Sequence, residues 1–306
     1  MDRVVIVSKP SRLEELVRQH LTEGAARFFL ETQGQSIEPY RAEDAAYQAA
    51  LAEVRRQVPN DIPVATVSRG DLPGFLFRDK DLIVVCGPDG LFANLASNPY
   101  VRDQPILTVN PDPSTIAGVL MLYEPHAVGG VIAQVLRGEH KLESLPLMRA
   151  FIEEGQELWG VNDVFIGRKD HVSARYEMSF GGRKERQSSS GIIVSTGVGS
   201  TGWMRSVATM VEGLVREGTP HKLSSLPKAD ANELVFVVRE PFPSPTTGTS
   251  LVTGRVIPGK PLVVTSEMPD GGYVFCDGVI EKAIQWNAGN SVTITVGDRY
   301  VQRIAR

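Results

Sequence analysis

A tight Gly-Pro-Asp-Gly turn, residues 87–90, is the first feature of the sequence that could carry out chemistry. It follows the apolar run Leu82–Cys86, which predicts a buried strand, and residues 91–97 after it have a helical pattern. A strand, a turn and a helix N-terminus direct backbone N–H groups toward one point, so this turn is expected to bind anionic oxygens. The carboxylate of Asp89 could then hold a metal ion or accept a proton from a hydroxyl group. Because Pro, Asp and Gly are also ordinary turn formers, the turn alone leaves a purely structural role open.

A second glycine-rich loop, residues 197–202, reads Gly-Val-Gly-Ser-Thr-Gly. These letters match the dinucleotide fingerprint G-x-G-x-x-G of dehydrogenases. That fingerprint belongs to the first βαβ unit of a parallel domain, whereas this loop lies in the β-rich second half of the chain and no such sequence follows Val7. A Walker A loop is also excluded, because neither Gly-Lys-Ser nor Gly-Lys-Thr occurs in the sequence. The loop is therefore interpreted as neither of these nucleotide motifs.

Polar and aromatic side chains elsewhere in the second half suit a nucleoside. Asn162 and Asp163 precede a strand pattern at residues 164–167. An amide and a carboxylate side by side can donate to and accept from the neighbouring hydroxyl groups of a ribose. Trp203 adds a ring that can stack on a base or a nicotinamide. Each has an ordinary alternative, since an Asn-Asp pair is a common turn and an aromatic residue on a helix is usually part of the core.

The first third of the chain alternates short apolar runs with helical patterns. Ser11 and Glu14, after Pro10, form a capping-box signature for a helix that reaches about His20. Strands that alternate with helices predict a doubly wound, mostly parallel α/β domain, whose ligands bind at the carboxyl ends of the strands. The expected strands are 4–7, 63–67, 82–86 and 106–109, and further helices are expected at 41–56 and 127–137.

The second half of the chain consists of short β-rich runs separated by Gly and Pro, which predicts a mainly antiparallel β domain. One helix is expected inside it, from Gly202 to about Arg216, and residues 240–254 predict a long loop. We expect an N-terminal α/β domain of residues 1–124 and a C-terminal β-rich domain of residues 125–306, whose last strands could return to the first domain. The expected strands are 163–166, 174–180, 191–196, 234–238, 261–266, 273–277 and 291–296.

The composition excludes several classes of protein. The chain has 306 residues, which favours two domains, and its net charge of -4 argues against a general nucleic-acid binder, because binding to a phosphate backbone needs a concentrated basic surface. No apolar run reaches the roughly 18 residues that span a bilayer, and the first residues lack a signal-peptide pattern, so a cytoplasmic protein without membrane contact is expected. Cys86 and Cys276 are too few for a disulfide framework or a zinc site.

In their order and spacing the motifs resemble those of the NAD kinases. Residues 87–91 resemble the GGDGT motif that NAD kinases share with diacylglycerol, sphingosine and phosphofructokinase-type kinases. Pro88 replaces the second Gly of that motif and Leu91 replaces its Thr. Since Pro88 has no backbone N–H and Leu91 has no hydroxyl, a weaker hold on phosphate is expected, whereas the catalytic Asp89 is retained.

The second glycine loop resembles the T-x-x-G-S-T-A-Y sequence of the same family. Two of its positions differ, because Gly202 stands for the Ala and Trp203 for the Tyr. An indole ring can still stack on a base, although it offers an N–H in place of a hydroxyl. The residues that fit are Thr196, Gly199, Ser200, Thr201 and, one turn further along, Ser206.

Further stretches resemble the mitochondrial-type branch of the NAD kinases. Ser190 is the most informative position, since most NAD kinases have an Asp there, near the nicotinamide. The Asn162-Asp163 pair resembles the Asn-Glu pair with which the family binds the dinucleotide ribose, here with a shorter acidic side chain. Residues 27–78 correspond poorly. The matching stretches are 3–11, 105–121 with Asn110, 162–207, 238–241 and Asp277-Gly278.

The resemblance implies an ATP- and Mg²⁺-dependent kinase that phosphorylates the 2′-hydroxyl of the adenosine ribose of NAD, giving NADP. It implies a β-sandwich-like second domain, an Asp89 that orients or deprotonates the hydroxyl, and Mg²⁺ carried by ATP near Asp89 rather than by a side-chain cluster. A homodimer with small-molecule nucleotides as ligands is also implied. The residues expected to bind nucleotide are Gly87, Gly90, Asn110, Asn162, Asp163, Ser190, Gly199, Ser200, Thr201, Gly202, Trp203, Ser206 and Asp277.

Two other functions are consistent with the same residues. A lipid kinase of the diacylglycerol or sphingosine kind shares the first motif, but it would need an apolar pocket for acyl chains and access to a membrane. A non-catalytic NAD or NADP sensor would have kept the ligand site and lost phosphoryl transfer through Pro88 and Leu91. Incubation with ATP, Mg²⁺ and NAD, followed by an assay for NADP, separates the kinase from the sensor, and diacylglycerol as the acceptor tests the lipid kinase.

Overall fold

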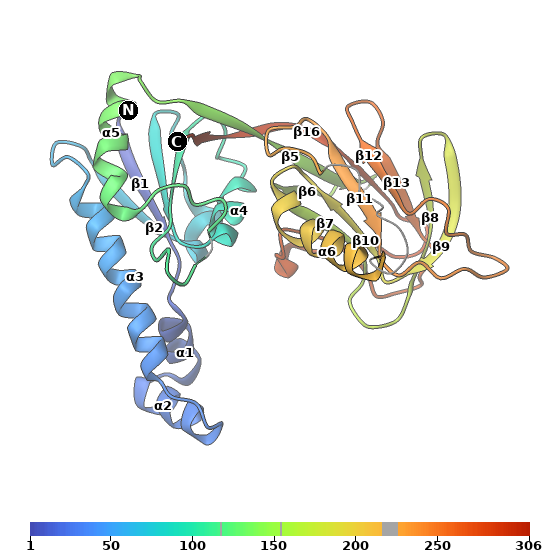
Figure 1. The fold of residues 1–306 in the computed structure, drawn as a ribbon, viewed down its shortest axis with the longest axis horizontal. Helices are drawn as coiled ribbons and strands as arrows, with labels where there is room; N and C mark the ends of the chain where they lie inside the picture. The colour runs from blue at the N-terminus through green and yellow to red at the C-terminus, as the bar shows by residue number, and fades with distance from the viewer. Residues whose placement is uncertain (117, 154, 216–225) are drawn as a thin grey trace. The chain divides into compact units, whose positions relative to one another are not determined.

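The computed structural model describes residues 1–306 apart from 117, 154 and 216–225 (Figure 1). The chain divides into two compact units. Unit 1 comprises Met1–Glu143 and Gln302–Arg306, and unit 2 comprises Ser144–Val301.

Unit 1 is built on a parallel sheet. Its strand order is β2-β1-β3-β4, and the final residues of β16 pair parallel with β4 through Arg303 and Ile106. The first strand, β1, is almost completely buried from Val4 to Val7, which explains its uninterrupted apolar sequence. The strands are β1 (Arg3–Ser8), β2 (Val64–Ser68), β3 (Asp81–Cys86), β4 (Pro105–Val109) and the end of β16 (Ser291–Ile304).

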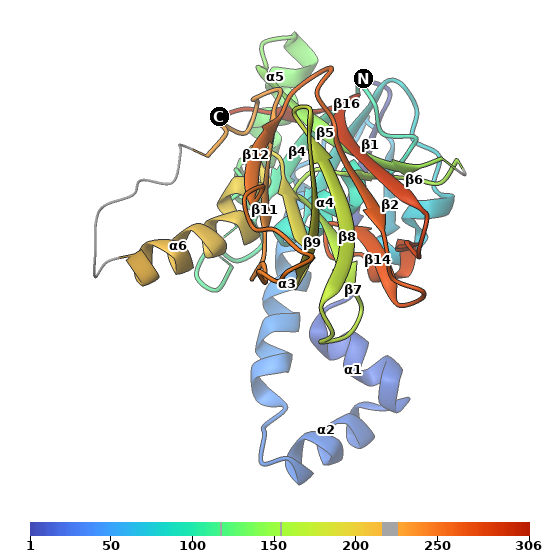
Figure 2. The same ribbon diagram turned by 90° about the vertical axis from the view of Figure 1, so that its right-hand side faces the viewer.

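Helices cover the sheet of unit 1 and extend beyond it. Tyr47 and Val54 of α3 and Val131 of α5 share one apolar core with the strands. The helices α1 and α2 and the first half of α3 project away from the sheet (Figures 1 and 2). The elements are α1 (Arg12–His20), α2 (Glu23–Thr32), α3 (Glu38–Arg56), η1 (Arg69–Gly74), α4 (Asp89–Ala96), η2 (Pro125–Ala127) and α5 (Val128–Arg137).

Unit 2 consists of antiparallel strands in two layers. One layer has the order β12-β11-β10-β7-β14-β15, and in the other β16, β13, β8 and β9 are neighbours, with β5 pairing with β16 and β6. Both layers contribute to one core, where Tyr176 and Val264 of one meet Ile166 and Phe236 of the other. Buried residues alternate with less buried ones along β8, β13 and β14, since each layer has one face in the core.

The elements of unit 2 are mostly short. The single α-helix that the structure describes in this unit is α6, which begins at Trp203. The elements are β5 (Leu142–Ile152), β6 (Glu157–Gly160), β7 (Asp163–Arg168), β8 (Ala174–Phe180), β9 (Arg183–Ser189), β10 (Ile192–Ser195), η3 (Gly199–Thr201), α6 (Trp203–Val215), β11 (Leu234–Val238), β12 (Thr253–Val256), β13 (Leu262–Ser266), β14 (Gly272–Cys276), η4 (Ile280–Lys282) and β15 (Ile284–Gln285).

The expected fold class, a parallel α/β part followed by an antiparallel β part, is confirmed. The capping box at Ser11 is also confirmed, because its hydroxyl accepts from the Glu14 N–H at 3.1 Å and its own N–H donates to the Glu14 carboxylate at 2.8 Å. The elements α2, β5, β6, β9 and β15 were not expected from the sequence, and β12 begins at the end of the expected 240–254 loop. The expected end of the second-half helix, Arg216, lies outside the described residues.

No helix in the described part of the chain is both long enough and apolar enough to cross a membrane. Within the same residues, no group of three or more His, Cys, Asp and Glu side chains is placed to hold a metal ion.

Candidate functional site

The turn after β3 has the strand-turn-helix form that its sequence predicts. The Gly87 N–H donates to the Val109 carbonyl at 3.1 Å, which fastens the turn to the end of β4. The helix α4 begins at Asp89 with Pro88 as its N-cap residue, and Pro88 provides no side-chain cap. The first helical N–H groups are therefore not capped by a side chain, and Gly90 beside them is exposed.

Asp89 in this turn binds backbone groups of a neighbouring loop. Its Oδ1 accepts from the Leu120 N–H at 3.0 Å and its Oδ2 accepts from the Val119 N–H at 3.1 Å. The carboxylate is half-buried, and this burial raises its pKa, while the two N–H groups and the positive charge of Arg303 lower it. Each oxygen has a second lone pair, so the carboxylate can still accept a hydrogen bond from a ligand hydroxyl.

Asn110 lies at the start of the loop that follows β4 and contains Val119 and Leu120, and its side chain shapes this loop. Its Nδ2 donates to the Ile116 carbonyl at 3.0 Å, and its Oδ1 accepts from the Asp112 N–H at 3.1 Å. A side chain at Gly118, where φ is 49°, would place its Cβ only 2.4 Å from Asn110 Nδ2. Asn110 and Gly118 together therefore form the loop whose amides hold Asp89.

A cavity of about 660 Å³ lies at the carboxyl ends of β1 and β2. This cavity was not expected from the sequence, although Ser8 and Ser68, the last residues of the two strands, are a signal in it. The hydroxyl of Tyr47 joins this region to β3, because it accepts from the Lys9 N–H at 3.0 Å and donates to the Cys86 carbonyl at 2.9 Å. The polar residues lining the cavity are Ser8, Lys9, Glu14, Arg18, Gln48, Thr66 and Ser68.

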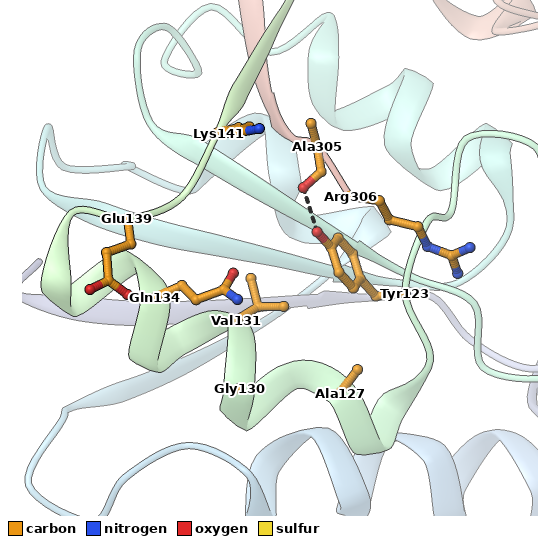
Figure 3. A pocket seen from close by; sticks show the side chains of 9 residues that line it. All are labelled: Tyr123, Ala127, Gly130, Val131, Gln134, Glu139, Lys141, Ala305 and Arg306. Atoms are coloured by element: carbon orange, nitrogen blue, oxygen red, sulfur yellow. Dashed lines mark hydrogen bonds between the residues drawn. The ribbon is translucent and has the colours of Figure 1, made fainter.

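Another cavity of unit 1, of about 630 Å³, lies beside α5 (Figure 3). It is lined by Tyr123, Gln134, Lys141 and Arg306, among others, and the Tyr123 hydroxyl donates to the Ala305 carbonyl. None of the residues expected to bind nucleotide lines it.

In unit 2, Asn162 and Asp163 lie at the corner between β6 and β7, here called the 161–163 corner. The carboxylate of Asp277 accepts from its three successive N–H groups, those of Val161 at 2.9 Å, Asn162 at 2.8 Å and Asp163 at 3.1 Å. Burial raises the pKa of Asp277 to about 6, although these three hydrogen bonds lower it. Asp277 was expected to bind nucleotide, and the structure shows its carboxylate bound to the backbone of this corner.

The side chain of Asp163 differs from the backbone of the 161–163 corner in its hydrogen bonding. Asp163 Oδ1 is buried and has no hydrogen-bond partner in the described structure. Burial and the nearby charge of Asp277 raise the pKa of Asp163 to about 7, against the lowering effect of the Ser195 hydroxyl. Since an unpartnered buried polar atom is costly, this oxygen marks a place where a ligand donor would be favourable.

The second glycine loop packs directly against the 161–163 corner. Thr196 donates its N–H to the Asn162 carbonyl at 2.9 Å and its hydroxyl to the Val161 carbonyl. The Gly199 N–H donates to the Thr196 hydroxyl at 3.2 Å. A Cβ at Gly199 would lie 2.2 Å from the Asn162 carbonyl oxygen, so glycine is required here by the close approach of the corner.

The remaining hydroxyl groups of this loop are directed to its own backbone. Ser200 donates to the Thr196 carbonyl at 3.1 Å and Thr201 to the Val198 carbonyl at 3.0 Å, and Ser206 lies 3.5 Å from the Gly202 carbonyl. These bonds stabilise the short helix η3 and the start of α6. Ser200 is buried, whereas Thr201 and Ser206 are exposed.

Trp203 has an aromatic and a cationic neighbour inside unit 2. Its ring stacks on Phe165 with centroids 5.7 Å apart and an angle of 17°, and the Arg239 guanidinium lies 5.9 Å from the ring centroid. The exposed Ser190 lies next to this group, because its N–H donates to the Arg239 carbonyl at 3.0 Å. The half-buried Trp203 therefore packs on Phe165 at the start of α6, and Ser190 is connected to it through Arg239.

The structure thus gathers the expected residues at two places, one in each unit. Asp89 and Asn110 are joined through one loop in unit 1. In unit 2, Asn162, Asp163 and Asp277 meet the glycine loop through Thr196.

Sequence comparisons lead to the NAD kinases. No protein-family model matches the chain. An NAD kinase from Heliobacterium modesticaldum is 28% identical over 190 residues, which are 56% of this chain and 66% of that protein. An NAD kinase from Thermococcus kodakarensis is 28% identical over 134 residues, and one from Thermococcus sibiricus is 30% identical over 130 residues. The last two matches cover 42% and 41% of this chain, and 46% and 45% of the relatives' own length.

Solved structures of the same kind resemble nearly the whole chain. Yeast NADH kinase complexed with NADH has a TM-score of 0.63 at 14% identity and covers 99% of this chain and 83% of its own. An NAD kinase from Archaeoglobus fulgidus in complex with ATP has a TM-score of 0.61 at 16% identity and covers 99% of this chain and 93% of its own. The chain therefore has the fold of the NAD kinases, and NAD kinases are its relatives in sequence.

Proposed function

We propose that this protein is an NAD kinase, which transfers the γ-phosphoryl group of ATP to the 2′-hydroxyl of the adenosine ribose of NAD. The observation that carries the proposal is the buried Oδ1 of Asp163, which has no hydrogen-bond partner among the described residues and belongs to the residue that follows Asn162, in a chain with the NAD kinase fold. Vicinal ribose hydroxyls supply the donors that this oxygen lacks. The curated relatives and the structures complexed with NADH and with ATP support the same ligands.

Asp89 is the proposed acid-base residue. Its raised pKa makes the carboxylate a better proton acceptor than an exposed aspartate, and the amides of Val119 and Leu120 fix its orientation. One free lone pair on either oxygen can accept the hydrogen bond of the ribose hydroxyl and then its proton. A positioned base of this kind contributes about a hundredfold to ten-thousandfold to the rate.

The cavity at the carboxyl ends of β1 and β2 is the proposed site for part of ATP. In a doubly wound sheet ligands bind at these ends, and β1 lies next to β3, whose own end leads into Asp89. Lys9 and Arg18 would provide positive charge for phosphate oxygens. Mg²⁺ bound to ATP would neutralise phosphate charge during transfer, and the carboxylate of Asp89, an oxygen donor with free lone pairs, fits such an ion.

We also propose that the protein is of the mitochondrial type, that it is cytoplasmic and that it is a homodimer. Ser190 at the position where most of the family has an Asp supports the type, and the family resemblance supports the dimer. Light scattering that gives twice the chain mass of 33.4 kDa would establish the dimer, and a monomer mass would reject it.

A catalytically inactive NAD or NADP sensor is the second candidate, and one observation favours it. Leu91, which stands where the GGDGT motif has its Thr, is fully buried, and Pro88 at the N-cap has no N–H to offer a phosphate. The turn therefore lacks two polar groups of the motif.

The experiment that tests the proposal is an assay for NADP after incubation of the purified protein with ATP, Mg²⁺ and NAD. The kinase predicts NADP in proportion to time and protein. NAD binding without NADP would establish the sensor instead, and phosphorylation of diacylglycerol in a parallel assay would contradict both.

A further inference from the structure

We infer that Asp277 and Thr196 are positioning residues that hold the backbone of the 161–163 corner in one conformation and so present Asn162 and Asp163 to a ribose. The two residues with their hydrogen bonds to the corner are here called the clamp. The inference rests on the proposed function for the identity of the ligand. The clamp itself rests on the geometry of unit 2, where all of these residues lie.

The carboxylate of Asp277 occupies the N–H side of the corner. Three successive N–H groups that converge on one point form a nest, which binds an anion. Here the anion belongs to the protein, because Oδ2 accepts from Val161 and Oδ1 accepts from both Asn162 and Asp163. The Asp277 N–H also donates to the Asp163 carbonyl at 2.9 Å, so the two segments are bonded in both directions.

The backbone of Asp277 is in an unusual conformation. Its φ is 52° and that of the following Gly278 is 72°, both in the left-handed region. Asp is one of the few residues other than Gly that adopts this region at modest cost. The turn directs the Asp277 carboxylate back to a corner more than a hundred residues earlier in the chain, and Gly160 beside it has no room for a larger residue without a tight contact, since its Cβ would lie 3.2 Å from Cys276 Cβ.

Thr196 occupies the carbonyl side of the corner. Its hydroxyl donates to Val161 and accepts from the Gly199 N–H, and its own N–H donates to Asn162. Thr196 is fully buried, so each of these bonds is protected from water. The hydroxyl therefore joins the corner to the glycine loop through one atom.

The N–H groups of Val161, Asn162 and Asp163 and the carbonyl groups of the corner have hydrogen-bond partners, whereas the side chain of Asp163 differs from the backbone in this respect. The half-buried Asn162 keeps part of its surface exposed, and the buried Asp163 Oδ1 has no hydrogen-bond partner among the described residues. A clamp that fixes the backbone beside these two polar side chains is suited to a ligand with hydroxyl donors and acceptors. Asp277 acts on the ligand through this corner and not by direct contact.

The first test is hydrogen exchange of the ligand-free protein, with the variants Asp277→Asn and Asp270→Asn. Asn has nearly the shape of Asp but places an amide N–H₂ against backbone N–H donors, so the amides of residues 161–163 should exchange about tenfold faster or more. Asp270 is exposed, with 83% of its side chain accessible, and its variant should exchange like the wild type. Unchanged protection of the corner in a folded Asp277→Asn protein would overturn the clamp.

Thr196→Val and Thr196→Ser form a second, matched pair that does not depend on the folding of Asp277→Asn. Val has the shape of Thr without the hydroxyl, whereas Ser keeps the hydroxyl. Faster exchange at the Gly199 amide and the corner in the Val variant, restored in the Ser variant, supports the clamp. Equal exchange in both variants overturns it.

Calorimetric titration with NAD tests whether Asp277 and Thr196 contribute to NAD binding. A small displacement of binding groups costs up to about a hundredfold, so Kd for NAD should rise about tenfold or more in Asp277→Asn and Thr196→Val, with Kd for ATP unchanged within about twofold. Loss of corner protection without a change in Kd for NAD would overturn the positioning role. A wild-type protein that does not bind NAD would overturn the proposed function, while the exchange data would still decide whether the clamp exists.

Discussion

The turn of Asp89 in unit 1 and the 161–163 corner in unit 2 use carboxylates in opposite ways. Asp89 accepts one backbone N–H on each oxygen, and these bonds order the loop that contains Asn110. At the corner the two tasks are divided, because Asp277 accepts three N–H groups, while one buried oxygen of Asp163 has no partner in the described part of the chain. In unit 1, one carboxylate therefore both anchors a loop and keeps a free lone pair on each oxygen, whereas at the corner the anchor and the ligand group are separate residues.

The largest effect is expected from Asp89→Asn, which changes the carboxylate in unit 1. If Asp89 is the base, this variant should lower kcat for NADP formation by about a hundredfold or more, because the amide cannot accept the hydroxyl proton. Kd for NAD should change by less than about threefold, since the loop can keep one of its two bonds. Steady-state kinetics and calorimetry measure the two effects, and the exposed Asp103→Asn serves as the control. Equal turnover in Asp89→Asn and wild type would remove Asp89 from the chemistry.

The close approach at the corner is tested by Gly199→Ala. The new Cβ would lie 2.2 Å from the Asn162 carbonyl oxygen, and the backbone there cannot withdraw easily. We expect the free energy of unfolding to fall by about 1 to 3 kcal/mol, with weaker NAD binding, measured by urea denaturation and calorimetry. Gly213→Ala on α6 is the matched control, because its Cβ meets nothing within 4 Å and Ala favours a helix. A Gly199→Ala protein as stable as Gly213→Ala would show that the corner is not tightly packed.

The buried oxygen of Asp163 is tested by the pH dependence of stability. Its folded pKa of about 7 lies above the unfolded value of about 3.9, so between these values the folded state holds a proton that the unfolded state has lost. Stability should therefore be greatest at low pH within this window and fall as the pH rises toward 7.

Asp163→Asn removes this titration. At pH 8 it should be more stable than the wild type by up to about 4 kcal/mol, and its remaining pH slope should be the smaller one of Asp277, whose folded pKa is about 6. Thermal unfolding from pH 4 to pH 8 measures this, with Asp270→Asn as a control that keeps the wild-type slope. If the stability of the wild type rises from pH 5 to pH 8, and that of Asp163→Asn rises by the same amount, the raised pKa is not that of Asp163.

The smallest expected effect concerns Pro88. Pro88→Gly restores the backbone N–H that the GGDGT motif has at this position, and glycine tolerates the extended conformation there, with φ of -78° and ψ of 167°. We expect turnover to rise by about twofold to fivefold, and stability to fall by about 0.5 to 1 kcal/mol because the unfolded chain becomes more flexible. Enzyme kinetics and urea denaturation test the two parts. A lower turnover would show that this N–H does not meet phosphate.

Much of the fold could be predicted because its elements have local signals. The strands β1, β3 and β4 are uninterrupted apolar runs, and the capping box at Ser11 fixes the start of α1. In contrast, α2 has only two buried residues, and the strand β9, at the end of a sheet, reads Arg-Lys-Glu-Arg-Gln-Ser-Ser and buries only its Gln and its last Ser. Elements that bury little apolar surface leave a weak pattern in the sequence.

The candidate site could be predicted only as far as local motifs reach. The turn at Asp89 and the Asn162-Asp163 pair are contiguous in sequence, and both were identified from their residue types. The Asn162 N–H donates to an Asp277 carboxylate that lies 115 residues away in the sequence, so no local pattern indicates that Asp277 is an anchor. The cavity near Lys9 and Arg18 likewise depends on the parallel pairing of β1 and β2.

The proposed kinase activity is tested most directly by the identity of the product formed from NAD. Wild type and Asp89→Asn are incubated side by side with ATP, Mg²⁺ and NAD, and NADP is quantified by an NADP-specific enzymatic assay. We predict NADP from the wild type and formation about a hundredfold slower from Asp89→Asn. No NADP from a wild-type protein that binds NAD, or equal rates from the two proteins, would contradict the proposal.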